Sequence, residues 1–242
     1  MRSSFWMRRA AAAAGLLAAV ACGPRAAIPP LPHAPVPIAM TASPAETSLA
    51  KALAPVLYLQ ADESFQLARA VAVVHPDSQV IAYHLLWRDD AHGAWIPFTV
   101  PTDQEVVWVG YDSTGAPTRL WTYWHGSILN AAWHGRQPAV DVQWGKHGSL
   151  PHRTHLGDLP LDQRLGVYYA LSWALPDLWL GRASREGPLC FCGGYRRYRD
   201  FSEPRLLGPS LDAIVRAADP GTMLRRVFGE RYSEKPEWPW EA

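Results

Sequence analysis

The sequence carries almost no net charge: 23 lysines and arginines stand against 22 aspartates and glutamates, which leaves a formal charge of +1. A protein that binds the phosphate backbone of nucleic acid needs a basic surface, and this balance does not supply one. Three enzyme signatures are also missing, because there is no Gly-x-Ser-x-Gly nucleophile elbow, no His-Glu-x-x-His zinc motif and no phosphate-cradling loop. We therefore expect no nucleic-acid partner and assign no catalytic residue.

Cysteine is scarce as well, with Cys22, Cys190 and Cys192 as the three in 242 residues. Two cysteines alone do not make a metal site, so Cys190 and Cys192 offer a structural disulfide, two unbridged structural thiols or a redox pair. A Cys190–Cys192 disulfide requires an oxidising compartment. Its ring would be small and strained, and therefore easily reduced.

The N-terminus has the organisation of an export signal. Three arginines among the first nine residues precede the apolar stretch Ala10–Ala21. A membrane-spanning helix requires about 20 apolar residues, so this stretch is too short to cross a bilayer. It fits the apolar region of a signal peptide.

The end of this stretch, Ala19-Val-Ala-Cys22-Gly23, resembles a bacterial lipobox, although leucine is commonest at the place of Ala19. The resemblance implies that residues 1–22 are a lipoprotein signal peptide and that Cys22 becomes the lipid-modified, palmitate-bearing N-terminus. Gly23 in place of aspartate implies sorting to the outer membrane. An ordinary cleaved signal peptide and a non-exported chain are the alternatives. We therefore expect an exported protein held in the bacterial cell envelope by a lipid anchor.

Composition indicates where the folded domain begins. Residues 23–47 are rich in proline and alanine and lack the large apolar side chains of a core, so they should form a stiff tether. Residues 48–158 carry short apolar stretches separated by turn-forming residues, at 54–60, 69–74, 80–87, 105–111, 118–124 and 138–144. Such a series predicts an antiparallel β-sandwich.

Residues 159–242 have a different pattern and are expected to pack on the sandwich as a helical and loop extension. Apolar residues at 161–175 and 222–228 predict helices, Ser210 is an N-cap candidate for a further helix at 211–218, and a loop is expected at 181–209. The predicted fold class is therefore mainly β: an antiparallel β-sandwich with a C-terminal helix and loop extension.

Asp103 and Glu105 stand at the head of an apolar, strand-like run. Residues two apart on a strand share a face, so the two carboxylates should lie close together and repel each other. A divalent cation such as calcium, magnesium or zinc would neutralise them, and so would a nearby base such as His125, His147 or Lys146. The alternative is a structural role, with Asp103 capping a turn and Glu105 at a solvated strand end.

Several segments occur in the order found in the vacuolar-protein-sorting-sixty-two-like domain. Leu53–Phe65 is similar to its opening strand and Pro-Asp-Glu turn, and Asp103–Val109 is similar to its Asp-Trp-Glu-x-Val strand. Trp124–Gly126 resembles its Ser-Gln-His-Gly, and Pro138–Pro151 resembles its segment Pro-Val-Val-Tyr-Val-Ala-x-Gly-Ser-His-Ala-Ser-Tyr-Pro. The resemblance covers residues 53–151 and implies a β-sandwich.

That family is related to the necrosis- and ethylene-inducing cytolysins, whose Gly-His-Arg-His-Asp-Trp-Glu motif holds a divalent cation that receives a sphingolipid sugar headgroup. Asp103 and Glu105 match the two acids of this motif, whereas residues 99–102 replace its Gly-His-Arg-His. The loss of both histidines argues against toxin activity. The similar segments surround one end of the family's sandwich, so His125 and His147 could complete a metal site with the two acids.

Three functions remain open. The first is a non-catalytic, envelope-anchored β-sandwich that binds a polar headgroup or a glycan, with or without a divalent cation. The second is a structural lipoprotein that docks a partner protein, and the third is a metal-dependent hydrolase with Glu105 as its base. Convergence of the two acids and the two histidines within about 5 Å would favour a cation or catalytic site, and their separation would favour a structural role.

Overall fold

The computed structural model describes residues 41–61, 63, 66–88, 103–124, 126–134, 136–143, 147–154, 201–233 and 235–241. The expected signal peptide with Cys22, the pair Cys190 and Cys192, His125 and the helix expected at 161–175 lie outside these residues, so those predictions stay predictions. No helix in the described part of the chain is long and apolar enough to cross a membrane.

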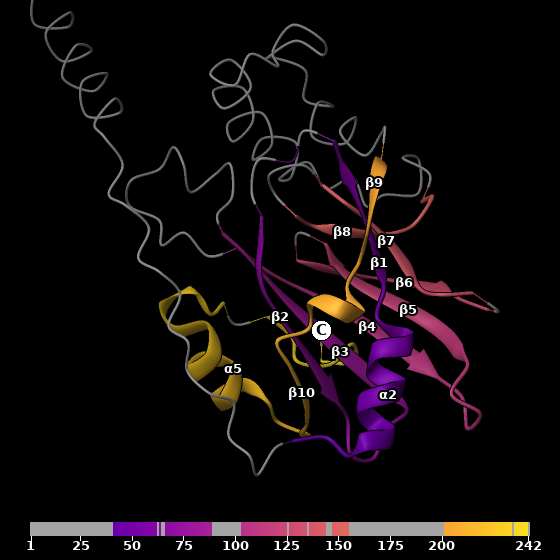
Figure 1. The fold of residues 1–242 in the computed structure, drawn as a ribbon, viewed down its shortest axis with the longest axis vertical. Helices are drawn as coiled ribbons and strands as arrows, with labels where there is room; N and C mark the ends of the chain where they lie inside the picture. Colours follow the sequence, from indigo (N-terminus) through magenta and orange to yellow (C-terminus); the bar gives the residue numbers. More distant parts are fainter. Residues whose placement is uncertain are drawn as a thin grey trace, which may run out of the picture.

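The described residues form two β-sheets with an apolar core between them (Figure 1). A six-stranded sheet has the order β10-β2-β3-β4-β5-β6, and a four-stranded sheet has the order β8-β7-β1-β9. The strands are β1 (Val56–Gln60), β2 (Leu67–Val74), β3 (Val80–Trp87), β4 (Gln104–Tyr111), β5 (Pro117–Trp124), β6 (Ser127–Ala132), β7 (Ala139–Val142), β8 (Ser149–Pro151), β9 (Phe201–Leu206) and β10 (Ala213–Arg216). The prediction of a mainly β sandwich is confirmed.

The central strands of the six-stranded sheet are buried on both faces. Every residue of β3 is buried, and β4 is buried as far as Gly110. Val107 and Val109 point into the core between the sheets, whereas Val106 and Trp108 belong to a second apolar cluster on the outer face. Two buried faces explain why these strands read as continuous apolar runs rather than as alternating patterns.

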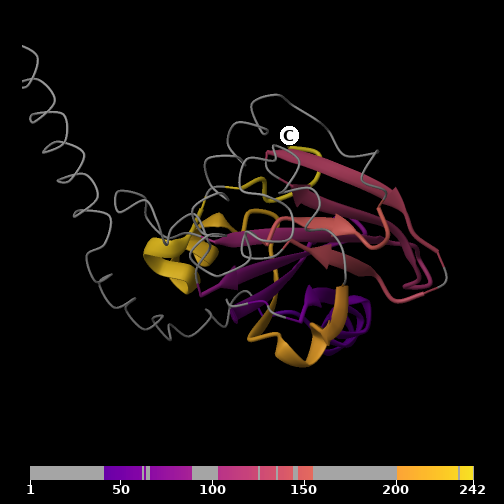
Figure 2. The same ribbon diagram turned by 90° about the horizontal axis from the view of Figure 1, so that it is seen from above.

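Two α-helices in the described part of the chain cover opposite faces of this sheet. Helix α2 (Pro44–Leu53) adds Ala50 and Leu53 to the core between the sheets. Helix α5 (Gly221–Phe228) packs on the outer face, where Trp238 joins the same cluster. The helices accordingly lie on different sides of the molecule in both views (Figures 1 and 2).

The expected tether at residues 23–47 extends too far, because its last residues belong to the folded domain. Ser43 caps α2 in a capping box: its hydroxyl accepts a hydrogen bond from the Glu46 backbone N–H at 3.3 Å, and the Glu46 carboxylate accepts one from the Ser43 N–H at 2.8 Å. Pro44 at the first helical position suits this start. The sequence Ser-Pro-Ala-Glu was therefore a helix signal within a proline-rich segment.

The sandwich is not wholly antiparallel and is not complete within residues 48–158. Strand β1 pairs in parallel with β7, and β10 pairs in parallel with β2. Strand β9 is an edge of the four-stranded sheet and β10 an edge of the six-stranded sheet, so the C-terminal region supplies a strand to each sheet as well as packing on them. Strands β6 and β8 were not expected either.

The prediction of a helix at 211–218 is wrong, whereas the prediction of a helix at 222–228 is confirmed by α5. Residues Ala213–Arg216 pair with Val71–Val74 of β2, and Val215 is buried. Ser210 ends the short 3-10 helix η3 (Gly208–Ser210) instead of capping an α-helix. Tertiary pairing with a buried strand here outweighs the local helical pattern.

Candidate functional site

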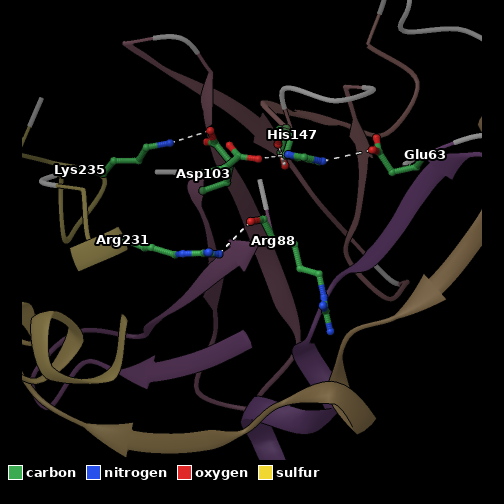
Figure 3. A network of polar contacts seen from close by, with 8 residues as sticks. Glu63, Arg88, Asp103, His147, Arg231 and Lys235 are labelled. Atoms are coloured by element: carbon green, nitrogen blue, oxygen red, sulfur yellow. Dashed lines mark hydrogen bonds and ion pairs between the residues drawn. The ribbon is translucent and has the colours of Figure 1, made fainter. Parts of the chain in front are cut away.

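Asp103 and Glu105 stand together at the start of β4 but take different partners (Figure 3). The carboxylate of Asp103 contacts Nδ1 of His147. Glu105 Oε1 lies 2.6 Å from Nζ of Lys235, which comes from the C-terminal segment. Both acids are buried, at 4% and 7% exposure. Each carboxylate is thus neutralised by a base from a distant part of the chain.

His147 lies between two carboxylates. Its Nδ1 contacts Asp103, and its Nε2 lies 3.4 Å from Oε1 of Glu63. The ring has no exposed surface and stacks on Trp87, with the ring centres 4.1 Å apart and the planes at 8°. Its backbone has a φ of 54°, in the left-handed region, and its N–H donates to the Gln143 carbonyl at 2.8 Å. The imidazole is therefore held at Nδ1 by Asp103 and on one face by Trp87, and its Nε2 faces Glu63 at ion-pair distance.

The charges of this cluster favour a protonated histidine. Burial alone lowers the pKa of His147, but the carboxylates of Asp103 and Glu63 outweigh burial and raise it to about 10. At neutral pH the cluster is therefore a buried carboxylate–imidazolium–carboxylate chain. It joins Glu63, which follows β1, to Asp103, which precedes β4, and so connects the two sheets.

This arrangement does not fit a shared divalent cation. Both ring nitrogens of His147 face carboxylates, and a protonated imidazole has no lone pair for a metal. Glu105 is held by an ammonium group instead. No group of three or more His, Cys, Asp or Glu within the described residues is placed to hold a metal ion. Because His125 lies outside those residues, the full set Asp103, Glu105, His125 and His147 remains a prediction.

Sequence reasoning missed Glu63 and Lys235. Glu63 belongs to a turn between two strands and gave no signal beyond turn composition, while Lys235 is 130 residues from Glu105 in sequence (235 − 105). Lys235 also lies 5.0 Å above the ring of Tyr123. Such contacts follow from the path of the C-terminal segment over the outer face of the sheet, which no local pattern encodes.

His84 of β3 is a further buried titratable group. Its ring is 1% exposed, and neither ring nitrogen has a hydrogen-bond partner among the described residues. Burial, aided by the charge of Lys235, lowers the pKa of His84 to about 3. His84 is therefore neutral at physiological pH, in contrast to His147.

A second acid–histidine pair lies on the four-stranded sheet, although sequence reasoning assigned His152 no site. Asp141 Oδ1 is 2.5 Å from His152 Nδ1, and Asp141 Oδ2 accepts a hydrogen bond from the Arg153 N–H at 2.9 Å. His152 stacks on Tyr58 at 4.0 Å. Burial raises the pKa of Asp141, although its bonds to His152 and Arg153 oppose that effect.

The C-terminal turn carries an exposed tryptophan. Trp240 is 53% exposed, and its ring stacks parallel on the buried ring of Trp238 with centres 5.7 Å apart. The ring of His75 meets both tryptophans edge-on, at 4.6 and 5.5 Å. The Glu241 carboxylate accepts hydrogen bonds from the N–H groups of Glu237 and Trp238, at 2.8 and 3.2 Å, which closes the turn.

Comparisons with known proteins identify no family for this chain. No family model matches the chain, and no curated protein matches it. A solved structure described as "NLPPya in complex with mannosamine" aligns with 49% of this chain and 73% of that chain, at 15% sequence identity and a TM-score of 0.36.

Proposed function

We propose that the protein is a non-catalytic, envelope-anchored β-sandwich that binds a sugar-containing ligand, and that Trp240 is its contact surface. The observation that carries the proposal is the exposed, stacked ring of Trp240 (53% exposed), in a turn fixed by Glu241. An indole face offers a flat apolar surface to the C–H groups of a sugar ring. Because the turn is already closed, ordering it on binding costs little.

The C-terminal segment is held firmly on the sheet behind this surface. Trp108 of β4 donates its indole N–H to the Glu237 carbonyl at 2.7 Å, and Trp238 donates its own to the Ala218 carbonyl at 2.7 Å. The buried Trp238 ring and the His75 ring then support Trp240 from behind and from the side. These contacts favour a pre-formed binding surface over a loose tail.

Acidic groups beside the turn favour a cationic amino sugar. Burial, together with the negative charges of the neighbouring acids Asp219 and Glu241, raises the pKa of Glu237 to about 7. A bound ammonium group would relieve the repulsion among these carboxylates. The proposal places the ligand at this turn instead of at Asp103 and Glu105, and it requires no cation.

The anchor belongs to the same proposal. The arginine-led signal and the lipobox-like Ala19–Gly23 support export and lipid attachment at Cys22 in the outer membrane. A lipid anchor would hold the sandwich near the envelope surface, where sugar-containing molecules are present.

The test is calorimetric titration of the domain with glucosamine and with glucose, which differ in the ammonium group. We expect glucosamine to bind more tightly than glucose, and Trp240→Ala to abolish binding of both. Leu206→Ala removes another large exposed apolar side chain of the described residues, at 56% exposure, and is the matched control. Glu237→Gln should reduce the preference for glucosamine. Equal binding by the wild type and Trp240→Ala would overturn the proposal.

A further inference from the structure

A cavity of about 160 Å³ lies at the open edge of the sandwich, between β2 and β3 of one sheet and β1 and β9 of the other. Its apolar lining includes Leu57, Leu59 and Trp87, which belong to the core between the sheets, and Leu67, which packs against that core. This core is therefore incompletely filled at one edge. A cavity of about 150 Å³ with apolar walls is large enough for a six-carbon ring.

The edge strand β9 directs a cation towards this space. Leu57 of β1 pairs with Arg205 of β9. Paired residues of antiparallel strands point to the same face, so Arg205 shares the inward face of Leu57. Arg205 is nevertheless exposed and lines the cavity. Its guanidinium has no hydrogen-bond or ion-pair partner within the described residues.

The other charged residues of the cavity are already engaged. Arg69 donates from Nη1 to the Val227 carbonyl at 3.1 Å. Asp212 accepts a hydrogen bond from the Ala70 N–H at 2.7 Å through Oδ2. Of the charged side chains around the cavity, Arg205 is thus the one that remains available to a bound molecule, and it selects for negative charge.

Trp87 of β3, in the other sheet, also lines the cavity. Its indole N–H is buried, and it has no hydrogen-bond acceptor in the described part of the chain. A buried donor without an acceptor is costly, so an oxygen atom of a molecule in the cavity would be stabilised there. The cavity therefore combines apolar side chains with the Arg205 guanidinium and with Trp87, whose indole N–H has no acceptor among the described residues.

We propose that this cavity binds a small carboxylate with an apolar body of about six carbons, with the body against Leu57, Leu59 and Leu67 and the carboxylate towards Arg205. This site is separate from the sugar-binding turn at Trp240, and it does not depend on the proposed function. Free short-chain acids and the carboxylate end of a larger molecule share this chemistry.

Hexanoate, hexanol and hexylammonium are the probes, because they share a six-carbon body and differ in charge. We expect calorimetric titration to give binding in the order hexanoate, hexanol, hexylammonium. Arg205→Gln should weaken the binding of hexanoate about three- to tenfold, so that hexanoate binds about as tightly as hexanol. Arg119→Gln, a change at an exposed arginine of β5, is the matched control and should leave hexanoate binding unchanged.

Two further measurements locate the ligand. Ala68→Phe should fill the cavity and abolish binding of hexanoate and hexanol, with circular dichroism to show that the fold is retained. In a ¹⁵N NMR spectrum the indole peak of Trp87, identified by its loss in Trp87→Phe, should shift with hexanoate while that of Trp240 does not. The proposal would be overturned if hexanoate did not bind or if hexylammonium bound as tightly as hexanoate. It would also be overturned if Arg119→Gln weakened hexanoate binding as much as Arg205→Gln.

Discussion

The carboxylate of Asp103 contacts Nδ1 of His147, and this contact joins the six-stranded sheet to the four-stranded sheet. Glu63 faces the other ring nitrogen, at 3.4 Å from Nε2. Two buried acids that looked like cation ligands in the sequence are therefore matched with bases: His147 for Asp103 and Lys235 for Glu105. The structure gives this end of the sandwich a stabilising role.

Removal of His147 should destabilise the fold strongly. The substitution His147→Leu leaves Asp103 and Glu63 buried without the cation between them, and breaking a buried ion pair from one side costs about 3 to 5 kcal/mol. Urea unfolding followed by circular dichroism measures the loss. His134→Leu, at an exposed histidine, is the control and should change stability by less than about 0.5 kcal/mol. Equal losses of stability in His147→Leu and His134→Leu would contradict the conclusion that His147 links the two sheets.

The same cluster should make stability fall in alkaline solution. The pKa of His147 is raised from 6.5 to about 10 in the folded protein, so its contribution is complete below about pH 6.5 and is lost as the pH rises towards 10. The difference in unfolding free energy between wild type and His147→Leu should therefore shrink across this range. A difference that stays constant from pH 6.5 to 10 would show that His147 is neutral when folded.

His84 should act in the opposite direction, in acid. Its pKa is lowered from 6.5 to about 3, so between these pH values the unfolded chain binds a proton at His84 and the folded protein does not. Its contribution is present above pH 6.5 and declines as the pH falls towards 3. His84→Leu should remove this decline, so the variant gains stability relative to the wild type as the solution is acidified. Parallel stability curves for the two proteins between pH 3 and 6.5 would refute this assignment.

Divalent cations should leave the melting temperature unchanged. A ligand that binds only the folded state raises stability by mass action, but Asp103 and Glu105 are directed to separate bases. Thermal unfolding with added calcium, magnesium or zinc checks this. A metal-dependent rise that the double change Asp103→Asn with Glu105→Gln abolishes would instead support the cation site, completed by His125. Glu105→Gln alone serves if the double variant does not fold.

Local patterns in the sequence were enough to predict the central strands. The boundaries expected for 80–87 are those of β3, because an apolar run of 8 residues between turn residues has the length of a strand and is short for a helix. The edge strands were harder to predict from the sequence. Strand β9 is exposed along nearly its whole length and contains Pro204, and β10 has only four residues, so neither carries the pattern of a buried strand.

The polar cluster could be predicted only in part. Asp103 and Glu105 stand two positions apart on a strand, which suggested a shared cation, and His147 was among the bases expected to balance their charges. The sequence did not show that Lys235 would take Glu105, because that contact depends on how the C-terminal segment crosses the outer face of the sheet. Long-range pairings of this kind follow from the assembled fold and not from spacing.

The lipid anchor gives the last prediction. The short apolar stretch and the lipobox-like end predict that Cys22 is the attachment point, and acyl chains bind a bilayer by about 0.8 kcal/mol for each buried CH₂. Cys22→Ala should therefore move the protein out of the membrane fraction and remove labelling by a palmitate analogue. Cys190→Ala, at a cysteine outside the signal, should retain both properties and is the matched control. A wild-type protein that carries no lipid label, or a Cys22→Ala variant that stays in the membrane fraction as mature protein, would favour an ordinary cleaved signal peptide or another mode of attachment.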